Sequence, residues 1–446
     1  MGRTKHVGIV GAGLVGSLLG ILLRKRGFSV SIYEKRGDLR EAIVTNGRSI
    51  NLALSDRGIR TLKEAGIYEE ISDELVPMRG RMIHQGENSN FQPYGEDGQF
   101  INSVSRIDLN KRLIAIGEEA GINYHFNHRC VDVNTDRTTV YFGYDGDEIK
   151  VRHDLLVGAD GAFSEVRKSI LEKDKSEFNK SFLDYGYKEL TIPKGEDDFQ
   201  LPPNYLHIWP RGRFMLIALP NPDKTFTCTL FLPYEGAKSF ENLTTKAEIS
   251  NFFSEEFSEV QKLMPDLASE FLQNPTSSLV TIKSFPWSSN NTMVVGDAAH
   301  AIVPFYGQGM NAGFEDCRIL MELVDRHDAD WGLILPIFES TRKKDADAIG
   351  ELALKNFEEM SNKVMDSSFL ERKKIEAKLH ELYPQDWVPL YTMVTFSHIP
   401  YSQAQAIGEL QDQVFQKAKN EGFLSDYAKM IRELNTLKKD VLTTPR

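Results

Sequence analysis

The hydrophobic pattern of the first 34 residues predicts a strand, a helix and a second strand. Residues 6–10 form a short apolar run of the length of a buried strand, and residues 14–26 carry apolar positions at helical spacing. Gly27 marks a helix stop, and residues 29–33 alternate as a strand that ends at Glu34. A strand, a helix and a strand in this order are typical of an α/β fold with a parallel sheet.

The pattern changes in two later regions of the chain. Residues 181–289 are rich in proline and in alternating strands, which predicts an antiparallel sheet with one buried face, inserted into the α/β framework. Two strands of this sheet each place three side chains on a shared face: Met215, Ile217 and Leu219 on the first, and Thr227, Thr229 and Phe231 on the second. From residue 334 onward the chain is helical and amphipathic, so we expect a packing layer or an oligomer contact.

Further strands and helices are expected between these regions. Strands are predicted at residues 48–55, 77–84, 122–134, 154–161 and 292–295, and helices at residues 56–65, 105–120, 164–171 and 314–327. Asp108 is the expected N-cap of the second of these helices. Arg79 and Arg81 share one face of the strand at 77–84, where solvated surface charge is the default interpretation.

The charge and the composition exclude several classes of partner. A net charge of −11 at pH 7 argues against nucleic acid or an anionic membrane as a partner. Three cysteines, at Cys130, Cys228 and Cys317, are typical of a reduced, intracellular protein, so we expect a cytoplasmic location. No apolar stretch has the length of a membrane span, and the chain ends at Arg446 without an apolar tail. We therefore expect a soluble protein without a membrane anchor.

A glycine-rich motif connects the first predicted strand to the first predicted helix. Gly11, Gly13 and Gly16 match the pattern G-x-G-x-x-G, and Glu34 ends the second strand. The glycines allow a tight turn and a close approach of backbone N–H groups to a pyrophosphate, and the helix N-terminus adds partial positive charge. The acid can accept a hydrogen bond from a ribose hydroxyl. The complete order of strand, turn, helix, strand and acid predicts a dinucleotide site.

Two further strand ends carry polar turns. Asp160 and Gly161 end one apolar run, and Gly296 and Asp297 follow another. The second turn leads into a glycine-rich loop and a helix N-terminus, whose dipole favours negative charge.

A metal site is not predicted, although His125, His128 and Cys130 lie close together in the sequence. On a single strand the two histidines would point to opposite faces, which separates them as ligands.

Together, the three polar turns resemble those of the class A flavoprotein aromatic hydroxylases. That family carries a dinucleotide fingerprint, a DG motif and a GD motif around FAD, and has no separate Rossmann domain for NAD(P)H. The resemblance implies an α/β, Rossmann-like FAD-binding fold with an inserted antiparallel-sheet substrate domain and a C-terminal helical region. The expected boundaries are 1–76, 102–180 and 290–335 for the FAD-binding domain, 77–101 and 181–289 for the substrate domain, and 336–446 for the helical region.

Four stretches narrow the resemblance to the branch of the family that hydroxylates kynurenine. They are RSINLALS (48–55), MRGRMIH (78–84), GDAAHAIVPFYGQGMNAGFED (296–316) and PLYTMVTFS (389–397). The implied reaction uses FAD, NADPH and O₂ to convert L-kynurenine to 3-hydroxy-L-kynurenine through a flavin C4a-hydroperoxide, in tryptophan catabolism and NAD biosynthesis. An aniline ring is already activated, so no catalytic base is expected among the side chains.

Two alternatives from the residues stay open. One is a related hydroxylase that acts on another small aromatic acid, and the other is a dinucleotide-binding module without catalysis. The sequence also leaves open whether the chain is a monomer or a homodimer.

The resemblance assigns individual residues. The implied FAD contacts are Gly11, Gly13, Leu14, Val15, Gly16, Glu34, Lys35, Arg36, Ala53, Arg106, Val131, Asp160, Gly161, Asp297, Gly307, Gly309, Met310 and Asn311. The implied substrate contacts are Arg81, Tyr94 and Tyr401 at the amino-acid end, and Leu206, Ile217, Leu219, Thr229, Phe231, Pro304 and Phe305 around the ring. One position departs from the family. An Asn expected before Tyr401 falls near Asp366, with Asn362 one turn earlier, and an aspartate would prefer the substrate's ammonium group to its carboxylate.

Overall fold

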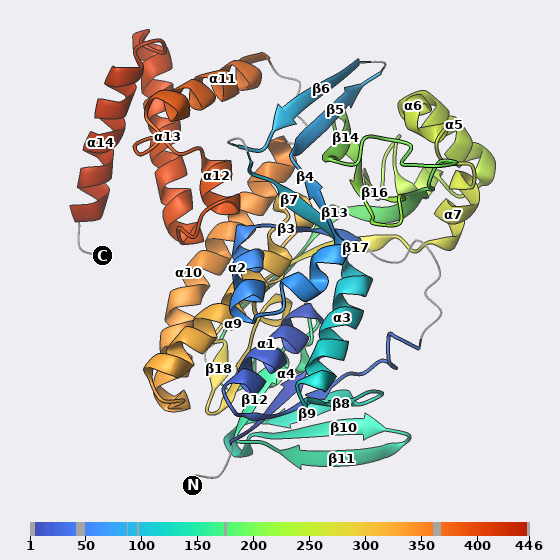
Figure 1. Ribbon diagram of the computed structural model, residues 1–446, viewed down its shortest axis with the longest axis vertical. Helices are drawn as coiled ribbons and strands as arrows, with labels where there is room; N and C mark the ends of the chain where they lie inside the picture. The colour runs from blue at the N-terminus through green and yellow to red at the C-terminus, as the bar shows by residue number, and fades with distance from the viewer. Residues whose placement is uncertain are drawn as a thin grey trace.

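Two large sheets and a set of C-terminal helices organise the molecule (Figure 1). The computed structural model describes residues 5–41, 50–86, 88–95, 98–173, 176–359 and 367–443. In the view of Figure 1 the parallel sheet with its helices lies in the lower part, and helices α11, α13 and α14 lie at the upper left.

The first sheet has six strands in the order β18-β19-β12-β1-β2-β8. Neighbouring strands pair in parallel, except for the antiparallel pair β18 and β19. The strands are β1 (His6–Val10), β2 (Ser29–Tyr33), β8 (Asn123–His125), β12 (Leu155–Gly158), β18 (Ser288–Ser289) and β19 (Thr292–Val294). The predicted strands at 6–10 and 29–33 are confirmed with the same bounds. Both strands are apolar runs because helices cover the sheet, so that the strand residues are buried.

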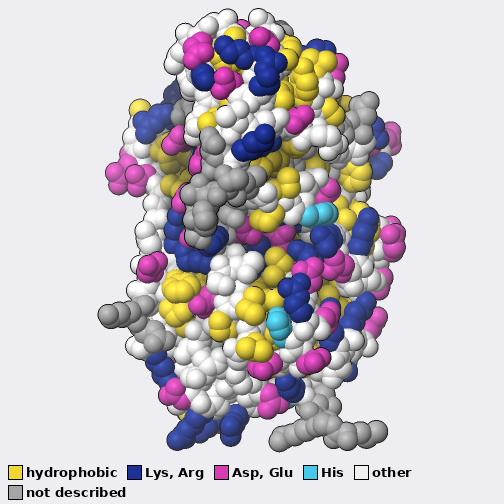
Figure 2. All heavy atoms as spheres, turned by 90° about the vertical axis from the view of Figure 1, so that its left-hand side faces the viewer, with side chains coloured by type: hydrophobic (Ala, Val, Ile, Leu, Met, Phe, Trp, Pro, Cys, Tyr) yellow, Lys and Arg dark blue, Asp and Glu magenta, His cyan; other side chains and the backbone are white. Residues whose placement is uncertain are grey.

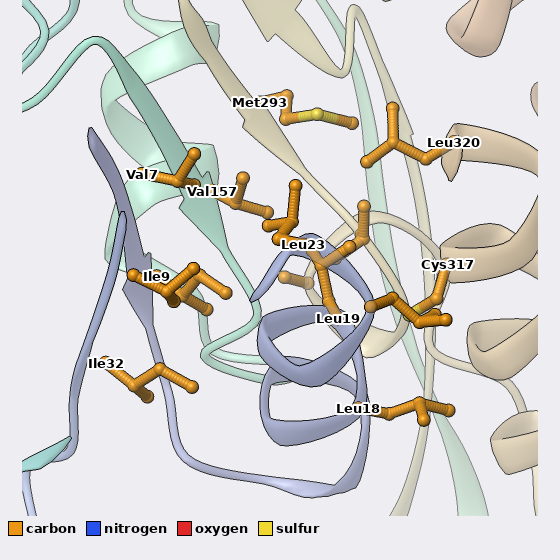
Figure 3. Close-up of a cluster of buried hydrophobic side chains, with 14 of the residues drawn as sticks. Val7, Ile9, Leu18, Leu19, Leu23, Ile32, Val157, Met293, Cys317 and Leu320 are labelled. Carbon is orange, nitrogen blue, oxygen red and sulfur yellow. The ribbon is translucent and has the colours of Figure 1, made fainter. Parts of the chain in front are cut away.

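Helix α1 (Leu14–Lys25) lies between this sheet and α9 (Gly309–Arg326). Figure 3 shows the apolar contacts: Leu18, Leu19 and Leu23 of α1 lie among Val7 and Ile9 of β1, Ile32 of β2, Val157 of β12, Met293 of β19, and Cys317 and Leu320 of α9. Helix α9 begins at Gly309 and not at the predicted residue 314, because the glycine-rich loop itself forms its first turn. The N-terminus of α9 therefore lies within the glycine-rich segment.

A small sheet of β9 (Arg129–Asn134), β10 (Thr139–Tyr144) and β11 (Asp147–Arg152) lies beyond β8. The single strand predicted at 122–134 is wrong, because a turn with Asn127 at φ 60° separates β8 from β9. The turn brings the rings of His125 and His128 to a centroid distance of 5.5 Å, so the two histidines are not kept apart as predicted. Within the described ranges, however, no group of side chains is arranged to hold a metal ion.

The second sheet has seven strands in the order β17-β13-β16-β15-β14-β5-β6. These are β5 (Gly80–Gln85), β6 (Asn88–Pro93), β13 (Glu177–Ile192), β14 (Tyr205–Arg211), β15 (Phe214–Pro220), β16 (Phe226–Pro233) and β17 (Ser277–Phe285). The pairs are antiparallel except β14 with β5, which is parallel. The strand predicted at 77–84 divides at Arg79, since β4 (Leu75–Met78) belongs to a different sheet.

The prediction that this sheet buries one face is wrong, because both faces are covered. One face places Met215 and Phe231 in a cluster with Phe305. The opposite face packs Leu216 and Leu230 against a separate apolar cluster from the helices that follow β16. Those helices are α5 (Lys246–Glu256), α6 (Ser258–Gln261) and α7 (Leu267–Gln273), which the strand-rich pattern of the region did not predict.

A third sheet holds β3 (Asn51–Leu54), β7 (Ile101–Ser105) and β4 in the order β3-β7-β4. Helices α2 (Asp56–Glu64), α3 (Arg106–Glu119), α4 (Glu165–Leu171) and α8 (Asp297–His300) complete the region around the first sheet. The N-cap of α3 is Ser105 and not Asp108, because the Ser105 side chain accepts a hydrogen bond from the Asp108 N–H. Asp108 lies in the first turn, where a negative charge complements the helix dipole.

The C-terminal region is helical, as predicted. Its helices are α10 (Trp331–Glu358), α11 (Ser367–Leu382), α12 (Leu390–Thr395), α13 (Tyr401–Glu421) and α14 (Tyr427–Thr443), with Gly422 at φ 74° after α13. Figure 2 shows the side of the molecule where these helices lie, with acidic and basic side chains interspersed. In the described part of the chain, no helix is both long and apolar enough to cross a bilayer.

We expect acid to destabilise the fold through His153. This residue is buried beside the rings of His6 and Tyr33, and its two ring nitrogens have no hydrogen-bond partner among the described residues. Burial lowers the pKa of His153 to about 4 from its ordinary value of 6.5, so the unfolded chain binds a proton more readily between these values. Stability is therefore fully present above pH 6.5 and falls as the pH drops toward 4.

At about pH 5 the loss through His153 amounts to about 2 kcal/mol. Urea unfolding at about pH 7 and about pH 5 measures it. The variant His153→Phe removes the titrating group, so its free energy of unfolding should change less between the two pH values than that of wild type. Equal losses in the two proteins would contradict the assignment.

Candidate active site

A cavity of about 330 Å³ lies where the turn after β1, the loop between α8 and α9, and the second sheet meet. The predicted residues that line it are Gly13, Leu14, Val15, Ala53, Arg81, Tyr94, Arg106, Gly161, Leu206, Ile217, Leu219, Phe231, Asp297, Pro304, Phe305, Gly307, Gly309 and Met310. Segments that the sequence assigns to cofactor and to substrate thus line the same cavity.

The three glycines of the first motif have different surroundings. Gly11 has φ +106°, and a Cβ there would lie 2.4 Å from the Ala159 carbonyl oxygen. A Cβ at Gly16 would lie 2.1 Å from the Gly11 carbonyl oxygen. A Cβ at Gly13 would meet no atom of the described chain within 4 Å. Two glycines therefore close the turn, and the third leaves an open cradle at the N-terminus of α1.

Glu34 is buried at the end of β2 and ties the turn to that strand. Its carboxylate accepts hydrogen bonds from the Ala12 N–H at 3.1 Å and from the Arg36 N–H at 3.0 Å. The Arg36 side chain adds a contact from Nε at 2.9 Å. Glu34, Lys35 and Arg36 lie outside the lining of the cavity, and the last two are exposed. The structure thus places Glu34 beside the glycine-rich turn that it would have to serve.

Asp160 and Asp297 differ in their environments. Asp160 Oδ2 accepts the Glu165 N–H at 2.8 Å, while Oδ1 is buried and has no hydrogen-bond partner within the described ranges. Burial raises the pKa of Asp160. Asp297 is exposed and lines the cavity. A buried carboxylate oxygen without a partner can accept a hydrogen bond from a ligand or a water molecule.

The loop before α9 is fixed by Asn311. The Asn311 side chain accepts the Ser55 N–H at 3.0 Å and donates to the carbonyl oxygens of Ala53 and Gly307 at 2.8 and 2.9 Å. Asn311 is fully buried and does not line the cavity, whereas Met310 does. The side chain of Asn311 therefore holds the loop against β3.

Val131 lies away from this cavity. Its side chain is exposed on β9, at an irregularity where the pairing with β10 shifts by one residue. The side chain therefore takes no part in lining the cavity.

Arg81 is surrounded by tyrosines at the wall of the cavity. Its guanidinium carbon lies 4.7 Å from the centroid of the Tyr391 ring and 5.6 Å from that of Tyr94, and Tyr391 stacks on both Tyr94 and Tyr306. Arg81 Nε is buried and has no hydrogen-bond partner among the residues that the structure describes. The guanidinium group is therefore placed to bind an anion in the cavity.

Burial raises the pKa of Tyr94 and of Tyr306 far above the usual range, so both hydroxyl groups stay protonated and can donate. Sequence reasoning missed Tyr306 and Tyr391, although both lie in stretches that carry the family resemblance. Only the fold shows that they meet Arg81.

The apolar wall comes from strands β15 and β16 and the segment at Pro304. Ile217 pairs with Thr229, and Met215 pairs with Phe231, so these side chains share one face of the sheet, as the alternation predicts. Met215 also lines the cavity and was not predicted to do so. Thr229 is fully buried outside the lining, and its hydroxyl has no hydrogen-bond partner in the described part of the chain.

Tyr401 is fully buried and does not line the cavity. Its hydroxyl donates to Gln308 Oε1 at 2.9 Å, and the Arg57 guanidinium lies 4.0 Å from its ring centroid. Gln308 does line the cavity, so Tyr401 reaches it through this amide. Asp366 and Asn362 lie outside the described residues.

A buried ionic network lies next to the loop that precedes α9. Glu315 pairs with Arg57 at 2.7 Å and with Arg342 at 3.0 Å, and Asp316 pairs with Arg342 at 2.8 Å and with His300 at 2.6 Å. Asp316 Oδ2 also accepts the Gly296 N–H at 3.0 Å. Burial disfavours the charge of Asp316, but His300 and Arg342 outweigh it and hold the pKa of Asp316 at about 2. The network fixes the turn of Gly296 and Asp297 against α9 and α10.

Comparison with known proteins identifies the family. The "FAD binding domain" family matches residues 4–325. The kynurenine 3-monooxygenase of Flavobacterium psychrophilum is 47% identical over 421 residues, which cover 94% of each chain. The enzyme of the same name from Sus scrofa is 43% identical over 420 residues, covering 92% of this chain and 88% of that one. This chain belongs to the kynurenine 3-monooxygenase family.

A solved structure has a fold similar to that of this chain. The 2-methyl-3-hydroxypyridine-5-carboxylic acid oxygenase superposes with a TM-score of 0.69 at 18% identity, over 83% of this chain and 96% of that one. The predicted fold class, an FAD-binding aromatic-hydroxylase fold with a C-terminal helical region, is confirmed.

Three residues at or near the cavity of this chain are suited to bind FAD. Gly13 leaves an open cradle, Asp160 Oδ1 is a buried acceptor, and Asp297 borders the cavity. These three features come from separate strand ends of the parallel sheet, where ligands of open α/β sheets bind. When bound there, FAD would supply the hydride-accepting and oxygen-activating ring that the side chains lack.

We expect Glu34→Ala to lose FAD, because the change removes the acceptor for the Ala12 and Arg36 N–H groups and the acceptor that Glu34 is predicted to offer to a ribose hydroxyl. The cost should be about 1–3 kcal/mol. The flavin-to-protein absorbance ratio after dialysis measures it, and Asp297→Ala should also lose flavin. The exposed Glu119→Ala is a matched control that should keep its flavin. Full flavin in both Glu34→Ala and Asp297→Ala would refute the assignment of these two residues to the FAD site.

Proposed function

We propose that this protein uses FAD, NADPH and O₂ to hydroxylate L-kynurenine. The reaction converts L-kynurenine, NADPH, a proton and O₂ to 3-hydroxy-L-kynurenine, NADP⁺ and water. The observation that carries the proposal is Arg81, a partly enclosed cation with a buried, unpartnered Nε among the described residues, at the same cavity as the glycine-rich turn. A small aromatic amino acid has both the carboxylate and the flat ring that this cavity suits.

Different side chains would bind the carboxylate and the ring of the substrate. Arg81 would bind the substrate carboxylate, and the protonated hydroxyl groups of Tyr94 and Tyr306 can add hydrogen bonds. Ile217, Leu219, Phe231 and Phe305 would enclose the ring and exclude water from the reacting atoms. No side chain is assigned as a catalytic base, since the ring amino group already activates its neighbouring carbon.

The test is NADPH oxidation by the purified, FAD-loaded protein with and without L-kynurenine. We expect L-kynurenine to accelerate the oxidation and 3-hydroxy-L-kynurenine to form, as identified by mass spectrometry. Stimulation without hydroxylated product would refute the proposed reaction. Hydroxylation of another small aromatic acid in preference to L-kynurenine would support the related hydroxylase instead.

We also propose a cytoplasmic location. Its support is that Cys130, Cys228 and Cys317 are all free and buried, which fits a reducing compartment. Recovery of most of the activity in washed membranes after cell fractionation would overturn this proposal.

A further inference from the structure

Three large aromatic side chains are exposed around one lysine on the outer half of β13. Phe163 is 64% exposed, and Phe178 and Phe182 are each 49% exposed. Lys180 lies between the two strand residues, with Nζ 5.5 Å from the Phe163 ring centroid and 5.6 Å from that of Phe182. We call Phe163, Phe178, Lys180 and Phe182 the aromatic patch. A group of exposed aromatic rings marks a binding surface more often than a single one does.

The aromatic patch adjoins the cavity through Val280 of β17, on the face of the sheet opposite to Phe231. Phe182 pairs directly with Val280 of β17, and Val280 lines the cavity. Directly paired residues of antiparallel strands point to the same face of a sheet. Phe178, Lys180 and Phe182 alternate along β13, so they also lie on that face. The patch therefore meets the cavity at Val280.

A second connection runs through the turn after β12. Phe163 follows Ala162, which lines the cavity together with Gly161. Arg167 holds this turn by donating to the carbonyl oxygens of Ala162 and Ala298, both at 2.7 Å. The Arg167 guanidinium also lies 5.2 Å from the Phe178 ring centroid. The turn and the strand thus bring the patch to the edge of the cavity from two directions.

The chemistry of the aromatic patch suits a ligand with flat rings and negative charge. Phenylalanine rings offer stacking surfaces, and a lysine between them offers a point charge to a phosphate. Lys168 on α4 adds a second exposed cation, although Glu165 lies 3.7 Å from its Nζ. NADPH combines two flat ring systems with several phosphate groups.

The chain has no second G-x-G-x-x-G that could bind a nicotinamide dinucleotide in a domain of its own. The nicotinamide must nevertheless come to the flavin cavity if NADPH is the reductant. A surface that adjoins the cavity meets this geometric requirement, and it leaves the substrate end at Arg81 free.

We propose that the aromatic patch is the docking surface for NADPH, with a ring stacked on Phe178 or Phe182 and a phosphate near Lys180. This inference rests on the proposed function and deepens it. The patch residues lie outside the cavity lining, so their substitution should leave FAD and L-kynurenine binding intact.

The test uses the FAD-loaded enzyme with L-kynurenine bound, under anaerobic conditions. Stopped-flow flavin absorbance at increasing NADPH gives an apparent Kd and a limiting rate of reduction. We expect Lys180→Ala and the double variant Phe178→Ala/Phe182→Ala each to raise the Kd by about tenfold or more. Calorimetric titration with NADP⁺ should show the same weakening without any turnover. Flavin content, L-kynurenine affinity and reduction by dithionite should stay unchanged.

A matched control exists on β11. Lys150 is an exposed lysine 5.6 Å from the Tyr141 ring centroid, on the small outer sheet. Lys150→Ala should leave the Kd for NADPH unchanged. A Kd within about twofold of wild type in both patch variants would overturn the proposal. Conversion of a wild-type dimer to a monomer in light scattering, with an unchanged Kd, would overturn it too and assign the patch to a second copy of the chain.

Failure of the proposed function and failure of the docking surface give different results. If NADPH does not reduce the flavin of wild type in the presence of L-kynurenine, the proposed function fails and the docking proposal fails with it. If wild type is reduced and the patch variants bind NADPH and NADP⁺ normally, the docking proposal alone fails.

Discussion

Arg81→Ala should abolish tight binding of L-kynurenine while the enzyme keeps its FAD. Moving a carboxylate from water into the cavity requires a charged, hydrogen-bonded partner, and loss of that partner costs about 3–5 kcal/mol. The expected loss in kcat/KM is therefore about a hundredfold or more. Flavin content should stay normal, because Arg81 lies beside Tyr94 and Tyr391, at the end of the cavity that we propose for the substrate.

Two comparisons separate a carboxylate clamp from a general disturbance of the wall. Arg81→Lys should recover only part of the affinity, because an ammonium group cannot reproduce the planar fork of a guanidinium. Kynurenine with an amidated carboxylate should bind wild type poorly and lose little more in Arg81→Ala. Steady-state kinetics and flavin absorbance titrations measure both.

Arg79→Ala is the matched control for this prediction, because Arg79 is exposed and lies just before β5. It should leave kcat/KM close to that of wild type. Near wild-type turnover by Arg81→Ala would place the clamp elsewhere, and a strong effect of Arg79→Ala would make that residue the next candidate.

Arg342→Met should destabilise the whole protein. Arg342 is fully buried and pairs with Glu315 at 3.0 Å, with Asp316 at 2.8 Å and with Asp345 at 3.2 Å. Its loss would remove the cation shared by three buried carboxylates, at a cost of about 3–5 kcal/mol. The free energy of unfolding in urea measures the change. FAD retention should fall as well, because Asp316 holds the Gly296 N–H beside Asp297.

The neighbouring Lys344→Met is the matched control, since Lys344 is exposed on the same helix. It should change the free energy of unfolding by about 0.5 kcal/mol or less. A loss of less than about 1 kcal/mol in Arg342→Met would show that the carboxylates find other partners or take up protons.

The sequence alone determined the glycine-rich turn and the strand and helix that flank it. Gly11, Gly13 and Gly16 follow a strand and open a helix, and their spacing reflects local backbone geometry that needs no distant partner. The strands at 6–10 and 29–33 were predictable for the same reason, because short apolar runs between turn signals depend on neighbouring residues. The cofactor and the family could therefore be inferred before the fold was known.

Boundaries set by distant contacts were not predictable. The alternation at 77–84 continues through Arg79, but β4 and β5 pair with different sheets, so the strand divides where its partners change. The seven-stranded sheet buries both faces because α5 to α7 cover the second one, and a pattern of alternating strands carries no sign of those helices.

Only the tertiary structure decided which polar residues meet at the site. Tyr306 and Tyr391 join Arg81 from segments far apart in the sequence, and Tyr401 is drawn away from the cavity lining to Gln308 and Arg57. Arg342 has no local signature, yet it neutralises carboxylates on α9. The physical reason is that a buried charge is stable only beside its partners, and the folding of distant segments determines those partners.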